Sequence, residues 1–66
     1  MTPNEILAQL ILRLRQEREL VISSVEELHP ERHKDAVDAL HEVEQLLNTQ
    51  INRLGRVQRR YGGPNS

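Results

Sequence analysis

The sequence predicts an all-α fold: an antiparallel helical hairpin that dimerises into a four-helix bundle. Aliphatic residues recur every three or four positions in two long segments, and a single His-Pro pair interrupts the chain near its middle. Repeats of this period place apolar side chains along one side of a helix. A chain of 66 residues without cysteine has no disulfide to support a small core, which favours association with a second copy.

The first helix is expected from about residue 3 to about residue 28. Thr2, Pro3 and Glu5 form a capping box, in which the Thr2 hydroxyl accepts the amide of Glu5 and Pro3 takes the first helical position. The apolar stripe that follows has heptad-like spacing, includes two polar members, and is widened by Ile11 and Val25. Its members are Leu7, Leu10, Leu14, Glu17, Val21, Ser24 and Leu28.

The turn is expected at residues 29–30. Proline disfavours helical geometry in the residue before it, but it suits the first turn of a new helix. The second helix is therefore expected from about residue 30 to about residue 61, and the short connection makes the two helices antiparallel neighbours. Its stripe, widened by Val37, Leu46 and Ile51, consists of Ala36, Leu40, Val43, Leu47, Gln50, Leu54, Val57 and Tyr61.

Gly55 leaves two alternatives for the end of the second helix, because glycine costs about 1 kcal/mol in a helix interior. The favoured alternative continues to Tyr61, since Val57 and Tyr61 keep the register of the stripe. The other ends the helix at Leu54 and leaves a basic tail. The hairpin thus covers residues 1–61, and residues 62–66, GGPNS, are expected to be disordered.

Stripes this wide exceed what one neighbouring helix covers, so two hairpins are expected to close a four-helix bundle. The expected dimer core consists of Leu7, Leu10, Leu14, Val21, Val25, Leu28, Leu40, Val43, Leu47 and Leu54. Acidic residues gather near the turn and arginines near the far end, so an antiparallel dimer sets unlike charges side by side. A simpler interpretation is that these charges complement the dipole of the second helix.

A charged stretch, Arg13 to Glu19, interrupts the apolar stripe at the centre of the first helix. In an antiparallel dimer whose two-fold axis crosses the helices, residues at this point face their own copies. A reciprocal pair between Glu17 and Arg18 would then fix the register of the dimer. Two other interpretations stay open: an exposed turn whose charged side chains reach solvent, or a site for a partner.

The sequence offers no constellation of catalytic, cofactor-binding or metal-ligating residues. The three histidines, His29, His33 and His41, lack the spacing of a zinc site, and no glycine-rich phosphate loop occurs. We therefore expect a non-enzymatic protein without a cofactor. Because no apolar run would span a bilayer and no signal-peptide pattern is visible, we expect a cytoplasmic protein without a membrane partner.

Binding to another macromolecule is the function that remains, and a regulatory or adaptor protein with a protein partner is favoured. Such a protein would use a helix face or apolar flank residues such as Ile22, Leu46 and Ile51. A regulator that binds RNA or DNA would instead use arginines to neutralise phosphates. Those arginines are Arg13, Arg53, Arg56, Arg59 and Arg60. In a third interpretation, another protein completes the bundle.

Ten residues and the hairpin pattern of the chain match those of a known protein family. The residues are Met1, Thr2, Glu5, Ala8 and Arg13, and further along Leu28, Asp35, Leu40, His41 and Leu47. In these features, most of the chain resembles the plasmid Rop (Rom) family. The resemblance implies an antiparallel four-helix bundle and the binding of kissing RNA hairpins through a face of the first helix. In the family an aromatic residue is central to that face, where this chain has Leu14, with Pro3 and Leu10 at other polar positions. Arg13 is the residue of that face that the resemblance carries over, and Glu44 falls where the family has a small apolar core residue.

Overall fold

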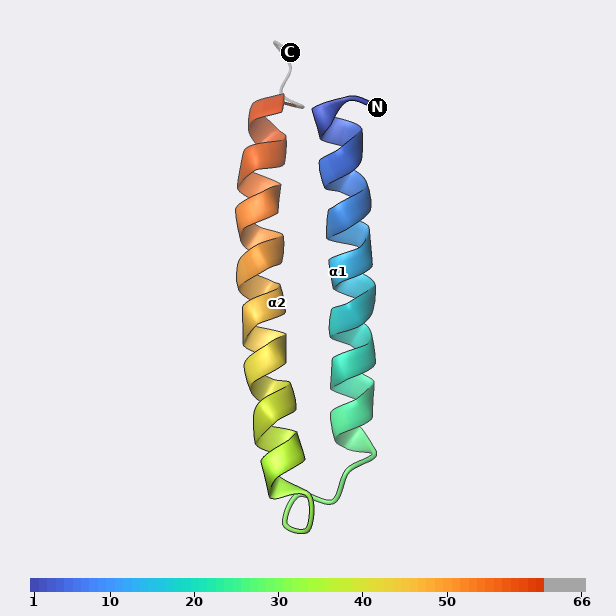
Figure 1. The fold of residues 1–66 in the computed structure, drawn as a ribbon, viewed down its shortest axis with the longest axis vertical. Coiled ribbons are helices and arrows are strands. Elements are labelled where there is room, and N and C mark those ends of the chain that lie inside the picture. Colours follow the sequence, from blue (N-terminus) through green and yellow to red (C-terminus); the bar gives the residue numbers. More distant parts are fainter. Residues whose placement is uncertain (62–66) are drawn as a thin grey trace.

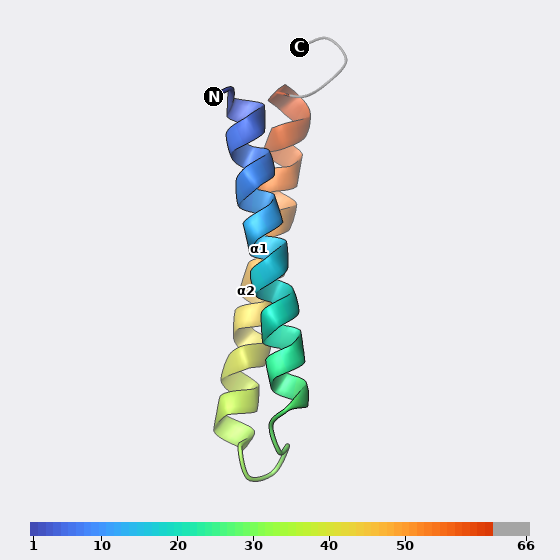
Figure 2. The ribbon, with the colours of Figure 1, turned by 90° about the vertical axis from the view of Figure 1, so that its right-hand side faces the viewer.

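The computed structural model describes residues 1–61 of the chain, so the tail predicted to be disordered, residues 62–66, lies outside the described residues. Two helices, α1 (Pro3–Glu26) and α2 (Lys34–Tyr61), lie side by side and run in opposite directions (Figure 1). Together they form a rod 52 Å long (Figure 2). The connection lies at one end, called the loop end, and the N-terminus and Tyr61 lie at the other, called the open end. The predicted helical hairpin is confirmed.

Helix α1 begins as its sequence predicts. The Thr2 backbone is extended, and its hydroxyl accepts the amide of Glu5 at 3.2 Å, so one of the free amides of the first turn is satisfied. Pro3 occupies the first turn, where its missing N–H costs no helical hydrogen bond. The amide of Ile6 donates to the Thr2 carbonyl at 3.1 Å, which is the first backbone hydrogen bond of the helix.

The connection is longer than the sequence predicts. Helix α1 ends at Glu26 and regular α2 begins at Lys34, four residues beyond the expected start near Pro30. The physical reason is a turn organised by two histidines. His29 Nδ1 accepts the amides of Glu31 at 3.2 Å and Arg32 at 3.1 Å, and His33 Nδ1 accepts the amide of His29 at 2.9 Å. These side-chain acceptors replace the backbone carbonyls that a continuous helix would supply.

Helix α2 continues through Gly55 to Tyr61, so the alternative that ends it at Leu54 is wrong. Gly55 has no positive φ. A methyl group added at its Cα would meet no neighbouring atom within 4 Å. Neither the backbone of the hairpin nor its internal packing therefore requires glycine at this position.

The contact between the helices is a heptad seam, and it is shifted from the stripes that the sequence suggested. With Ile11 and Ile51 at heptad position a, every seam residue is buried or half-buried. The seam consists of Leu7, Ile11, Leu14, Arg18, Val21, Val25 and Leu28 on one side and Val37, Leu40, Glu44, Leu47, Ile51, Leu54 and Gln58 on the other. Only Ile11, Val21 and Ile51 are buried among the described residues, and none of them completely. One hairpin therefore encloses little core by itself.

This shift separates the predicted dimer core into two groups. Eight of its ten residues lie in the seam of a single hairpin, whereas Leu10 and Val43 are 46% and 41% exposed. Ile51, expected on an apolar flank open to a partner, is instead one of the most buried side chains, at 6% exposed. That part of the prediction is wrong, because Ile51 is buried in the seam between the helices rather than exposed to solvent.

Candidate interaction surfaces

One face of the hairpin carries most of its exposed large apolar side chains. Leu10 and Val43 occupy heptad position g, and Ile6, Leu20 and Leu46 occupy position c beside it. In an antiparallel pair of helices the two g rows lie on one side of the seam and the two e rows on the other. We call the g side the apolar face. Its large side chains, 41–60% exposed, are Ile6, Leu10, Leu20, Val43 and Leu46.

The two helices both contribute to the central part of the apolar face. Arg18 is hydrogen-bonded to Asn48, so these two residues lie level on the rod. Because the helices are antiparallel and have the same rise per residue, Leu20 lies about level with Leu46, and Val43 lies about one turn nearer the loop end. The apolar face is therefore shared by α1 and α2 and is not a stripe on one helix.

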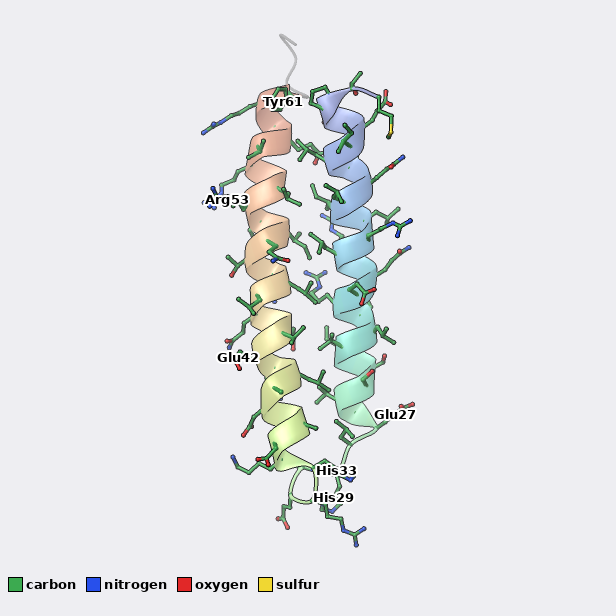
Figure 3. All side chains as sticks on the ribbon, viewed as in Figure 1. Glu27, His29, His33, Glu42, Arg53 and Tyr61 are labelled. Carbon is green, nitrogen blue, oxygen red and sulfur yellow. The ribbon has the colours of Figure 1, made fainter. Side chains whose placement is uncertain are left out.

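Charge divides the rod into two halves at the level of Arg18 and Asn48. The open half, residues 1–16 and 49–61, has six arginines and one carboxylate side chain, that of Glu5. The loop half, residues 17–48, has nine carboxylates and three basic side chains. The side-chain charges are thus +5 and −6, which together give the −1 of the whole chain. Figure 3 shows Arg53 toward the open end, and Glu42 and Glu27 toward the loop end.

The five arginines predicted to contact a nucleic acid or a protein partner do not form a single cluster. Arg53, Arg56 and Arg60 surround a shallow hollow beside Val57, and Arg59 lies on another side of α2. Arg13 is exposed on α1, at the border of the apolar face. Within residues 1–61, none of these five arginines has a carboxylate oxygen within 4.0 Å. They are therefore available to an anionic partner.

The two residues predicted to set the dimer register point to different places. Glu17 is exposed at position g, on the apolar face. Arg18 is half-buried in the seam, where its Nη1 donates to Asn48 Oδ1 at 2.9 Å. Asn48 was not predicted to take part, although it follows Leu47 of the predicted stripe and carries a carboxamide that can accept a hydrogen bond. Arg18 thus has a partner inside its own hairpin.

The histidines serve the local structure of the chain. His29 and His33 accept backbone amides in the connection, and His41 Nδ1 lies 3.8 Å from Glu44 Oε1 on α2. Among residues 1–61, no three His, Asp or Glu side chains gather closely enough to hold a metal ion. Lys34 forms an exposed pair with Asp38, 2.8 Å away, and this hydrogen bond and charge raise the pKa of Lys34 above 10.5.

Comparison of the chain with protein-family models, with curated proteins and with solved structures finds no match. Within the described residues, neither helix contains a stretch long and apolar enough to cross a lipid bilayer. The fold and its surfaces define the chain as an all-α helical hairpin with one apolar face and oppositely charged ends.

Proposed function

We propose that the protein is a non-enzymatic regulator or adaptor that works as a homodimer, with two hairpins closing a four-helix bundle through their apolar faces. The observation that carries this proposal is the concentration of exposed large apolar side chains on the g side of the seam. A face of this kind on a small soluble chain is typical of a protein interface. The seam of one hairpin buries few side chains, which also favours a dimer, because two layers of helices enclose far more apolar surface.

The charges of the two halves favour the antiparallel orientation of the dimer. When two rods pack with their loop ends opposed, the −6 half of each lies beside the +5 half of the other. When the loop ends pack together, like charges meet along the full length of the interface. The dimer axis then crosses near the middle of α1, where Glu17 lies on the apolar face. In this proposal Glu17 sets the register and Arg18 supports it from within the seam.

Sedimentation velocity of two lysine variants tests the dimer. Leu46→Lys places a charge on the apolar face, whereas Leu12→Lys places one at heptad position b, away from that face. The two leucines are 59% and 57% exposed, so the substitutions match in burial and chemistry. We expect the wild type and Leu12→Lys to sediment as dimers and Leu46→Lys to shift toward monomer. A monomeric wild type at tens of micromolar concentration, or equal masses for both variants, would overturn the proposal.

Binding of RNA or DNA is a second candidate function. It is favoured by the arginines of the open half, which have no carboxylate within 4.0 Å among residues 1–61, and by the resemblance to the Rop (Rom) family. The near absence of aromatic side chains weighs against single-strand binding by base stacking, so a protein partner is favoured. A salt titration with a labelled RNA hairpin pair and a DNA duplex separates the two functions. Phosphate contacts give binding that weakens steeply with salt, and its absence at low salt would remove this candidate.

A further inference from the structure

Gly55 has no role in the hairpin that another residue would not fill better. Glycine destabilises a helix interior by about 1 kcal/mol relative to alanine. The structure shows neither a positive φ nor a neighbouring atom that would exclude a side chain at this position. Neither the backbone nor the packing within the hairpin therefore explains the glycine at this position. What glycine supplies here is open space above the backbone.

That space is part of a groove of about 330 Å³ across the open half of the hairpin. Its floor contains Ile11 and Ile51, which are both buried in the seam, and Gly55 on α2 also lines the groove. Both helices contribute walls, and the groove is open to solvent along its length. The residues that line the groove are Ile11, Arg15, Ile51, Asn52, Gly55, Gln58 and Arg59.

The groove lies on the opposite side of the seam from the apolar face. Arg15 and Gly55 occupy heptad position e, and Asn52 and Arg59 occupy position b next to it. The e rows of an antiparallel pair lie on the side away from the g rows. The groove is therefore accessible in one hairpin, and it stays accessible when a second copy covers the apolar face.

The chemistry of the groove matches an acidic partner. Arg15 and Arg59 stand on its two walls, one from each helix, and within residues 1–61 neither has a carboxylate within 4.0 Å. Asn52 and Gln58 add carboxamides that hydrogen-bond to polar groups. Guanidinium groups bind carboxylates through paired, charge-assisted hydrogen bonds. A partner with carboxylates near the rim and a small apolar surface against the floor therefore complements both the arginines and the isoleucines of the groove.

We propose that the groove over Gly55 is a docking site for an acidic amphipathic helix of a partner protein. The missing side chain at Gly55 lets the partner helix approach the backbone of α2. The alignment set by Arg18 and Asn48 puts Arg15 and Arg59 about eight residues apart along the rod, so carboxylates about two helical turns apart pair with them. An open groove lined by only two helices leaves too much of a small ligand in water, whereas a helix covers it lengthwise. The inference rests on the proposed adaptor role and specifies its partner.

A display selection tests this proposal without knowledge of the natural partner. The probe is a library of helical peptides with apolar positions fixed at a three–four spacing and all other positions random. The library is selected on the full-length wild type after depletion on Gly55→Leu, whose Cβ enters open space and whose side chain is chosen to occupy the groove. We expect the enriched peptides to carry Asp or Glu residues about seven or eight positions apart, which matches the separation of Arg15 and Arg59 along the rod. No enrichment, or enrichment of sequences without these acids, would overturn the proposal.

Binding of an enriched peptide to variants then locates the site. We expect at least about tenfold weaker binding to Gly55→Leu, equivalent to ~1.4 kcal/mol, because the variant removes a central contact. The double variant Arg15→Gln/Arg59→Gln should bind more weakly and with less dependence on salt. Arg53→Gln/Arg56→Gln loses the same charge outside the groove and serves as its control. Equal weakening by both double variants would show general attraction to arginine and contradict a site at the groove.

The fold and the dimer are monitored separately from peptide binding. Gly55→Leu should unfold at a higher temperature than the wild type, because leucine has the better helix propensity. Weaker peptide binding by a more stable protein excludes misfolding as the cause. Sedimentation without peptide reports the dimer alone. A failed dimer with a functional groove and a failed groove with an intact dimer are therefore distinguishable results.

Discussion

Arg18 donates from Nη1 to Asn48 Oδ1 at 2.9 Å, and this hydrogen bond joins the middle of α1 to the middle of α2 across thirty residues of sequence. It lies in a part-buried seam that is otherwise mainly aliphatic. Apolar side chains along a seam tolerate a shift of one helix past the other, whereas a guanidinium and a carboxamide are satisfied only where they meet. The pair thus specifies how the two helices are aligned within one hairpin.

The first prediction concerns this pair. Asn48→Ala leaves the half-buried guanidinium without its acceptor, and we expect a loss of about 1–2 kcal/mol in the free energy of unfolding. The double variant Arg18→Met/Asn48→Leu replaces both polar groups by apolar ones and should recover most of that loss. Urea unfolding at one fixed protein concentration measures both, because stability depends on concentration in a dimer. If the double variant loses as much unfolding free energy as Arg18→Met and Asn48→Leu lose together, the two residues are not coupled.

The second prediction concerns the turn. His29→Ala removes the acceptor for the amides of Glu31 and Arg32, and we expect a cost of about 1 kcal/mol, as for the loss of a helix cap. His29→Asn restores a side-chain acceptor at the same position and should return part of the stability. Thermal unfolding followed by circular dichroism measures the difference. If alanine and asparagine are equally stable, the two hydrogen bonds contribute nothing.

The third prediction concerns the register of the dimer. Glu17→Leu extends the apolar face through its only charged central position, so the dimer should stay as stable or become more so while losing its unique alignment. A spin label at exposed Gln9 reports the distance between copies, and we expect one distance for the wild type and several for the variant. Glu19→Leu, on the outer side of α1, is the control and should keep one distance. A single unchanged distance in Glu17→Leu would contradict a register role.

The fourth prediction concerns Lys34, the only lysine of the chain. The hydrogen bond and charge of Asp38 raise the pKa of Lys34 above 10.5, so the pair stabilises the helix below that pH and is lost as the pH rises through the folded-state value. Asp38→Asn should lower the pKa of Lys34 toward 10.5. NMR titration of the single lysine side chain measures this directly. An identical titration curve in the variant would show that the pair does not persist in solution.

The sequence predicted the hairpin, the Thr2 cap and the passage of α2 through Gly55, because each depends on local chemistry. It misplaced the seam by one heptad position, since three adjacent rows of apolar residues offer two alternative seams and periodicity alone does not choose between them. The burial of Ile11 and Ile51 shows which of the two seams the hairpin uses. The bond between Arg18 and Asn48 was missed for the same reason, because it depends on how two distant segments align.

The start of α2 was also misplaced, by four residues. Pro30 correctly indicated the turn, but residues 30–33 form turns in which His29 accepts the amides of Glu31 and Arg32, and the regular helix starts only at Lys34. The sequence did not indicate that His29 would act as this acceptor. The groove over Gly55 had a visible sign in the sequence, the unfavourable glycine itself. Its depth and its arginine walls required the alignment of both helices.

The N-terminus and Tyr61 lie at the same end of the rod (Figure 1). In a single hairpin, a domain fused to the N-terminus or to the C-terminus would therefore lie at the open end, and the loop end would stay free. An antiparallel pair changes this layout, because the two open ends then point away from each other. Two fused cargoes would be held apart by roughly the 52 Å length of the rod, so the protein would act as a molecular spacer of fixed length.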